Sequence, residues 1–198
     1  LKENADQPMF SNDNERILMF NGEIYNHIEL RKTMEKRIAF NTDHSDSEVI
    51  LNGISLFGID FINKLRGQFS IFFWDKKKRK IYLVRDRLGQ KPLYFKHTKD
   101  SLTFGSNLKS IASAEKDFEL NLMSVSEYLD YGAIASPNTI FKNYNKVKPA
   151  EIIEFDYSKK QIEKKSKIYW DPENFIDNKQ FEKEEFFKKF SESIDIRT

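Results

Sequence analysis

Four short β-rich runs between residues 67 and 106 constrain the fold more than any other part of the sequence. They read QFSIFFWD, KIYLVRD, PLYFK and SLTFGS, and charged residues or glycine and proline separate them. Such runs, bounded by turn residues, are typical of β-strands joined by hairpins. We therefore expect an antiparallel meander here. A further strand pair is expected at EIIEFD and QIEKKSKIYW, and a buried strand at residues 17–20.

Two helix starts are visible in the first third of the chain. Asn26 and Glu29 have the spacing of a capping box, after which apolar residues recur every four positions as Leu30, Met34 and Ile38. The Ser45–Glu48 pair predicts a second start, with Gly58 as its stop. The face of this second helix is predicted to contain Val49, Ile50, Ile54 and Phe57.

Later helices are expected at residues 108–112 and 124–131, and in the last segment from Lys179. That last segment carries an apolar stripe of Phe186, Phe187, Phe190 and Ile194. Antiparallel strands combined with helices predict an α+β fold. The run Lys76 to Lys80 lies between two apolar strands and is interpreted as a solvated hairpin tip.

Composition narrows the function classes. The 198 residues include 33 basic and 31 acidic side chains, a net charge of +2, which argues against a dedicated nucleic-acid binder. No apolar run approaches membrane-spanning length, so no membrane partner is expected. There is no cysteine, hence no thiol nucleophile or thiolate metal site in these residues. The three histidines lack a metal-ligand spacing, and no metal site is predicted.

The stretch FNGEIYN, residues 20–26, holds the first candidate site. Asn-Gly between strands usually forms a hairpin turn, but a helix is expected to follow here. A strand-to-helix turn could instead direct the Asn21 amide and the Gly22 N–H at one point, as in an oxyanion hole. Glu23 and Asp46 could together bind an ammonium group through charge-assisted hydrogen bonds, although a favourable helix-dipole position alone would explain Asp46.

Five segments together resemble glutamine-hydrolysing asparagine synthetase, in the order and spacing of its N-terminal class II glutamine amidotransferase domain. They are FNGEIYN, HSDSEVIL, LRGQFSIFFWD, RDRLGQKPLYF and TFGSNLKSI, and YGAIASPNTIF and VKPAEIIEFD continue the pattern. The resemblance implies an N-terminal-nucleophile hydrolase-like αββα sandwich, two antiparallel sheets between helical layers, truncated at its N-terminus. Residues 1–170 would be this domain, and residues 171–198 a linker and first helix leading into an ATP-dependent synthetase domain.

The resemblance also implies roles for named residues. Asn21 and Gly22 would form the oxyanion hole, and Glu23 and Asp46 would bind the α-amino group of glutamine. The family's nucleophilic cysteine and its carboxylate-binding arginine precede the position of Leu1. We therefore expect the fragment to be inactive alone and to hold no cofactor, with ATP and Mg²⁺ acting on aspartate in the second domain. A cytoplasmic location and a possible homodimer are expected.

Two alternatives remain at this stage. The same domain could serve an amidotransferase that acts on another acid, such as a sugar acid, or that closes a β-lactam ring. It could also be a non-catalytic binding module that has lost its nucleophile.

Overall fold

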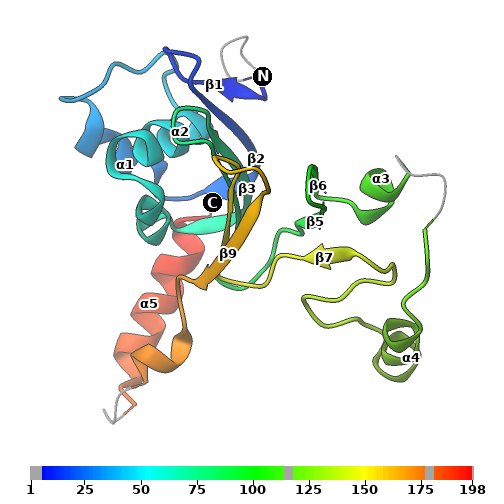
Figure 1. Ribbon diagram of the computed structural model, residues 1–198. Coiled ribbons are helices and arrows are strands. Elements are labelled where there is room, and N and C mark those ends of the chain that lie inside the picture. The colour runs from blue at the N-terminus through cyan, green and yellow to red at the C-terminus, as the bar shows by residue number, and fades with distance from the viewer. Residues whose placement is uncertain (1–5, 114–117, 177–180, 198) are drawn as a thin grey trace.

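Two antiparallel sheets form the centre of the computed structural model, which describes residues 6–113, 118–176 and 181–197 (Figure 1). The larger sheet has the strand order β1-β2-β3-β4-β8-β9, and the smaller has the order β6-β5-β7. The strands of the larger sheet are β1 (Met9–Phe10), β2 (Arg16–Ile24), β3 (Gly67–Asp75), β4 (Lys80–Arg85), β8 (Glu151–Asp156) and β9 (Glu163–Ile168). Those of the smaller sheet are β5 (Tyr94–His97), β6 (Leu102–Gly105) and β7 (Tyr144–Lys146).

Helices lie outside both sheets, in the order α, β, β, α (Figure 1). On the outer side of the larger sheet lie α1 (His27–Met34), α2 (Asp46–Phe57) and the 3-10 helix η2 (Ile59–Lys64). On the outer side of the smaller sheet lie α3 (Leu108–Ala112) and α4 (Leu122–Tyr131). The chain continues through the 3-10 helix η3 (Pro172–Phe175) into α5 (Lys183–Asp195). The predicted α+β class is confirmed.

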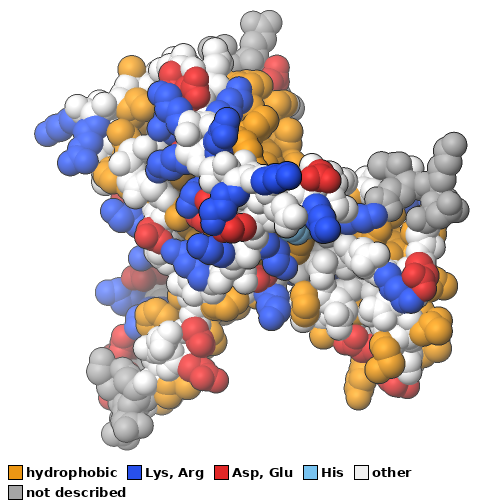
Figure 2. Space-filling model, viewed as in Figure 1, with side chains coloured by type: hydrophobic (Ala, Val, Ile, Leu, Met, Phe, Trp, Pro, Cys, Tyr) orange, Lys and Arg blue, Asp and Glu red, His pale blue; other side chains and the backbone are white. Residues whose placement is uncertain are grey.

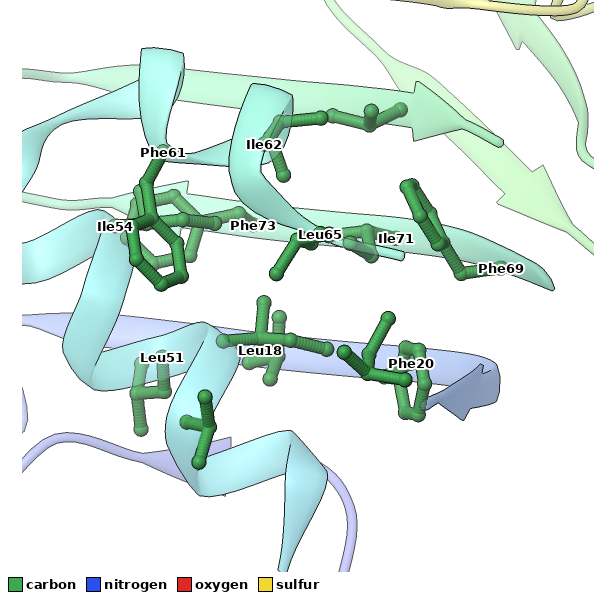
Figure 3. Close-up of a cluster of buried hydrophobic side chains, with 14 of the residues drawn as sticks. Leu18, Phe20, Leu51, Ile54, Phe61, Ile62, Leu65, Phe69, Ile71 and Phe73 are labelled. Atoms are coloured by element: carbon green, nitrogen blue, oxygen red, sulfur yellow. The ribbon is translucent and has the colours of Figure 1, made fainter. Parts of the chain in front are cut away.

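Strand β3 is buried on both faces, which explains its almost unbroken apolar run. Side chains alternate across a strand, so Phe69, Ile71 and Phe73 point toward α2 and η2, where Figure 3 shows them packed with side chains from β2. Phe72 and Trp74 point the other way, into the layer between the two sheets. One strand thus contributes to two separate apolar clusters.

The expected single meander is wrong, because the four β-rich runs divide between the sheets. β3 pairs with β4 in the larger sheet, whereas β5 pairs with β6 in the smaller. Asp86, at the start of the connecting segment, is fully buried and accepts hydrogen bonds from four backbone N–H groups. The donors are Phe69, Leu88, Gln90 and Lys91. These bonds hold the segment in a compact loop that leads to the second sheet.

Arg85 also holds the loop that follows β4, through hydrogen bonds to backbone carbonyl groups. Its guanidinium donates to the carbonyl oxygens of Gly89, Lys91 and Val147, at 2.6, 2.8 and 2.8 Å. Burial lowers the pKa of Arg85, and the neighbouring Asp86 carboxylate opposes that shift. The loop is therefore tied to both sheets through backbone groups that local sequence does not reveal.

The helix starts agree with the sequence only in part. Ser45 caps α2 by accepting from the Glu48 N–H, and Gly58 ends that helix, as predicted. The reciprocal half of the capping box is absent, because the Glu48 carboxylate accepts from the backbone N–H groups of Asn41 and Thr42 instead. Asn26 precedes α1 but does not cap it through its side chain.

Asn26 has a different structural role. Its amide donates to the Lys64 carbonyl at 3.0 Å and accepts from the Arg66 N–H at 2.9 Å, which ties the start of α1 to the segment before β3. The predicted capping role of Asn26 is therefore wrong, because its side chain forms hydrogen bonds with the distant backbone of Lys64 and Arg66 instead. Ile38 lies beyond the end of α1, although it still packs on the core.

The remaining sequence predictions concern the surface. Residues 76–79 form the hairpin turn between β3 and β4, as expected. Phe57 is 38% exposed, so it is not part of the buried face predicted for α2.

The last segment of the chain is described only in part. Residues 179–180 lie outside the described residues, and the described helix α5 leaves its apolar stripe about half exposed. None of the described helices is long and apolar enough to cross a membrane.

The edge strand β9 is exposed and lysine-rich. Lys164, Lys165 and Lys167 are all exposed, and Figure 2 shows basic side chains gathered over this strand. Charged side chains on an edge strand oppose pairing with the edge of another sheet. The larger sheet is therefore protected at this end.

Candidate functional site

The candidate residues of FNGEIYN lie in strand β2, not in a turn. Asn21 and Gly22 pair with Ser70 and Phe69 of β3, so the expected turn at Asn21–Gly22 is wrong. A Cβ atom on Gly22 would lie 2.0 Å from the Gln68 carbonyl oxygen, and the Gly22 φ is +152°. Glycine is therefore required at position 22 for the close approach of β3.

Strand alternation separates the candidate side chains from the core. Leu18, Phe20 and Ile24 point toward the helices and are buried. Asn21 and Glu23 occupy the opposite face of β2 and are exposed. The sequence therefore places an amide and a carboxylate two residues apart on the face that looks toward the second sheet.

A cavity of about 460 Å³ opens beside Asn21, at the mouth of the layer between the sheets. The Asn21 Nδ2 atom donates to the Ser106 Oγ atom at 3.1 Å, a contact that joins β2 to the end of β6. Asn21 Nδ2 has a second hydrogen, which is available for a ligand. The cavity is lined by Gln7, Met19, Phe20, Asn21, Ser70, Phe72, Leu93, Phe104, Gly105 and Ser106.

Gln7 holds the wall of this cavity in place. Its side-chain amide accepts from the Phe20 N–H at 2.5 Å and donates to the Phe20 carbonyl at 2.8 Å. Gln7 lies two residues before Met9, so its side chain continues the contact of this segment with β2 two positions beyond the Met9–Leu18 pair. Both backbone polar groups of the residue before Asn21 are therefore hydrogen-bonded.

Asp46 reaches the same end of β2 from helix α2. Its Oδ2 atom accepts from the Ile24 N–H at 3.2 Å, so the carboxylate lies against the residue that follows Glu23. Ser45 provides the helix cap, which leaves Asp46 in the first turn free to make this contact. Among the described residues, Asp46 Oδ1 has no hydrogen-bond partner, and the Glu23 carboxylate forms neither a hydrogen bond nor an ion pair, although the Glu23 backbone pairs with Gln68.

The structure thus places all four predicted site residues near one end of β2, and of these four only Asn21 lines the cavity. Sequence reasoning missed Ser106 and Gln7, which contact Asn21 and its neighbour Phe20. The segment TFGSNLKSI carries part of the family resemblance, but nothing in it marks Ser106 as a partner of Asn21, 85 residues away. Among the described residues, no group of three or more His, Asp or Glu side chains is placed to hold a metal ion.

Comparison with known proteins shows the class to which this fold belongs. Two solved structures, a glutamine phosphoribosylpyrophosphate amidotransferase from B. subtilis and an allosteric regulatory enzyme of purine biosynthesis, share the fold with TM-scores of 0.56 and 0.57. Each structure is 18% identical in sequence to this chain. The matches cover 83% and 84% of this chain and 32% of each solved chain. The fold is the αββα sandwich of N-terminal-nucleophile glutamine amidotransferases.

A family model adds the more specific result. The model described as glutamine amidotransferase domain matches residues 1–170, so the chain belongs to that family. Asparagine synthetase [glutamine-hydrolyzing] 1 of Bacillus subtilis is 38% identical over 148 residues, which are 74% of this chain and 23% of that protein. Putative asparagine synthetase [glutamine-hydrolyzing] 2 of Methanocaldococcus jannaschii is 35% identical over 158 residues. These residues are 78% of this chain and 30% of that protein. The chain thus spans less than a third of either relative.

Proposed function

We propose that this chain is the glutamine-hydrolysing part of an ATP-dependent asparagine synthetase and that glutamine binds at the Asn21 cavity. The observation that carries the proposal is the joint placement of Asn21, Glu23 and Asp46 at one end of β2, in a chain of the glutamine amidotransferase family. The names of the relatives at 35–38% identity support asparagine as the product. A cytoplasmic location belongs to the same proposal.

In this proposal, Asn21 stabilises negative charge on the reacting oxygen. A neutral amide suits the task, because its N–H donates without attracting the substrate carboxylate. Ser106 engages one hydrogen of Asn21 Nδ2 and orients the other toward the cavity. The Gly22 N–H would supply the second donor, as is common in oxyanion holes.

Glu23 and Asp46 bind the ammonium group of glutamine in this proposal. Glu23 is exposed and unpaired within the described part of the chain, and Asp46 has one oxygen left after bonding the Ile24 N–H. A cation that meets two carboxylates gains charge-assisted hydrogen bonds, which are stronger than neutral ones. The pair would therefore fix the amino end of the substrate.

The remaining chemistry requires groups outside these 198 residues. The sequence has no cysteine, so a thiol nucleophile would have to come from another segment. ATP and Mg²⁺ would act on aspartate in a separate synthetase domain. The described residues lack a cluster of metal ligands, and we assign no residue of this chain to either group.

The proposal is tested in the full-length protein by following asparagine formation from aspartate, ATP and glutamine. Asp46→Asn should raise the KM for glutamine about 10- to 100-fold, because a hydrogen bond to a charged group contributes about 1.5–3 kcal/mol. Synthesis from added ammonia should remain near the wild-type rate. The matched control is Asp130→Asn, which removes an exposed carboxylate on α4.

Three outcomes decide between the readings. An unchanged KM in Asp46→Asn would show that this carboxylate does not bind glutamine. Amide formation on another acid, with none on aspartate, would make the protein a relative with a different acceptor. Absence of glutamine hydrolysis in the full-length protein would support the non-catalytic binding module.

A further inference from the structure

A second cavity, of about 410 Å³, opens at the other end of the layer between the sheets. Along β3, Ser70 and Phe72 line the Asn21 cavity, and Trp74 lines this one. Phe72 and Phe104 stack between the two cavities with ring centroids 4.1 Å apart. The second cavity is lined by Trp74, Ile81, Lys99, Asp100, Leu102, Phe155, Tyr157, Lys159, Lys160 and Ile162.

The floor of this cavity is apolar. Phe155 is fully buried, whereas Trp74, Ile81, Leu102 and Ile162 pack on the same cluster but are only partly buried. These four side chains remain partly exposed because the cavity opens onto them. Pockets of roughly 300–1,000 Å³ with such a lining are typical of sites for small organic molecules.

One polar group on the floor is held in a fixed orientation. The Trp74 indole N–H donates to the Tyr157 hydroxyl oxygen at 2.6 Å, and the two rings meet edge to face. Because the oxygen acts as the acceptor in this contact, the phenolic hydrogen stays available to donate. The cavity therefore offers a positioned hydrogen-bond donor beside its aromatic wall.

The rim of the cavity is basic. Three lysines and one aspartate, Asp100, line the rim, and because Glu163 pairs with one of these lysines the formal excess is one positive charge. Lys159 pairs with Glu163 at 2.6 Å, but neither Lys99 nor Lys160 forms an ion pair with another described residue. The Lys76 ammonium lies 5.6 Å from the centre of the Trp74 ring, but it donates to the Asn14 carbonyl and is not part of the cavity lining.

We propose that this cavity binds a small organic anion with a flat apolar body, such as an aryl carboxylate. The aromatic floor would bury the ring, the Tyr157 hydroxyl would donate to the anionic group, and Lys99 and Lys160 would select its charge. The site is distinct from the Asn21 cavity and does not depend on glutamine hydrolysis. Aromatic burial supplies affinity, and the lysines supply discrimination between an anion and its neutral analogue.

The test is calorimetric titration of the 198-residue chain with 2-naphthoate and with 2-naphthamide. The two probes share the same ring system and differ in charge. We expect 2-naphthoate to bind one site, with an affinity that falls as salt rises because exposed charges are screened. We expect 2-naphthamide to bind more weakly and without that salt dependence. Equal affinities for the two probes, or no binding of 2-naphthoate, would overturn the proposal.

Two variants place the binding at this cavity. Lys99→Gln combined with Lys160→Gln should weaken 2-naphthoate about two- to thirtyfold, since each of the two exposed charge pairs contributes about 0.2–1 kcal/mol. Lys165→Gln combined with Lys188→Gln removes two exposed lysines that do not line the cavity and should have no effect. Identical losses in both double variants would show only general attraction to a basic protein and would reject the site.

Leu102→Trp gives an independent check, because the larger ring should fill the cavity. We expect loss of 2-naphthoate binding while the circular dichroism spectrum stays that of the wild type. If Leu102→Trp disturbs the fold, Tyr157→Phe replaces it, although this change also removes the acceptor of the Trp74 N–H. It should weaken 2-naphthoate more than 2-naphthamide, because a hydrogen bond to a charged acceptor is the stronger one. Unchanged binding in the variant that keeps its fold would contradict the proposed position.

Discussion

The two faces of strand β3 differ in how completely they are covered. Toward the helices, Phe69, Ile71 and Phe73 are each 1% exposed or less, in a cluster closed by α2 and η2. Toward the second sheet, Phe72 and Trp74 border cavities at each end of their cluster. The difference indicates a division of roles, with the helix-covered cluster stabilising the fold and the layer between the sheets leaving room for ligands.

The largest expected effect tests this division by truncating one ring in each cluster. Phe73→Ala should lower the free energy of unfolding by about 3–5 kcal/mol, the usual range for a buried Phe→Ala change. Phe104→Ala should lower it by less, because the Phe104 ring is only partly buried and already borders a cavity. Urea unfolding of both variants measures the difference, and equal losses would contradict the comparison.

The next effect concerns the close contact between β2 and β3. Gly22→Ala should combine backbone strain of about 1–3 kcal/mol with overpacking of about 1–3 kcal/mol, because its Cβ would meet the Gln68 carbonyl. Gly132→Ala is the matched control, since Gly132 also has a positive φ but no atom within 4 Å of an added Cβ. Thermal unfolding should show the larger loss for Gly22→Ala. A larger loss for Gly132→Ala would show that the contact with Gln68 relaxes freely.

A smaller effect is expected at Ser106, which contacts the candidate site from the second sheet. In the full-length protein, Ser106→Ala should lower kcat for glutamine hydrolysis about two- to tenfold, the value of one hydrogen bond of about 0.5–1.5 kcal/mol. Ser106→Thr keeps the hydroxyl and should restore most of the rate. A loss in both variants, or a change in KM alone, would show that Ser106 does not position Asn21.

The smallest effect is a pH dependence at His97. Burial, together with the nearby Lys164 charge, lowers the pKa of His97 below its ordinary value of 6.5. The folded state therefore binds this proton less readily than the unfolded state, and stability is lost as the pH falls through 6.5 toward the folded pKa. Urea unfolding between about pH 8 and pH 5 measures this loss. The free energy of unfolding should decline less in His97→Gln than in the wild type. An identical decline in both proteins would exclude His97 as its source.

The sequence predicted elements better than it predicted their partners. Alternating and apolar runs identified β2, β3, β4, β8 and β9, because strand period is a local property. The assignment of β5 and β6 to a separate sheet was not predictable, since it depends on the buried Asp86 and on Arg85 binding distant backbone groups. Hydrogen bonds of Asp86 with Phe69 and of Arg85 with Val147 join distant parts of the chain, and a local sequence pattern does not reveal them.

The candidate site shows the same limit. Asn21–Gly22 was expected in a turn from the usual preference of Asn-Gly, but pairing with β3 extends the strand through both residues. Asn26 was expected to cap α1, but its amide binds Lys64 and Arg66 across the fold. The residue pattern already suggests the site residues and the family resemblance implies their roles, whereas their joint position at the end of β2 required the structure.

The most direct test of the account is the Asn21→Ala variant of the full-length protein, assayed with glutamine and with ammonia. Removing one oxyanion donor typically costs about 2.7–4 kcal/mol, so kcat with glutamine should fall roughly 10²–10³-fold. Synthesis from ammonia should continue at nearly the wild-type rate, because that route bypasses the Asn21 cavity. If both rates fall together, Asn21 serves the fold, and if neither falls, the oxyanion role assigned to Asn21 is wrong.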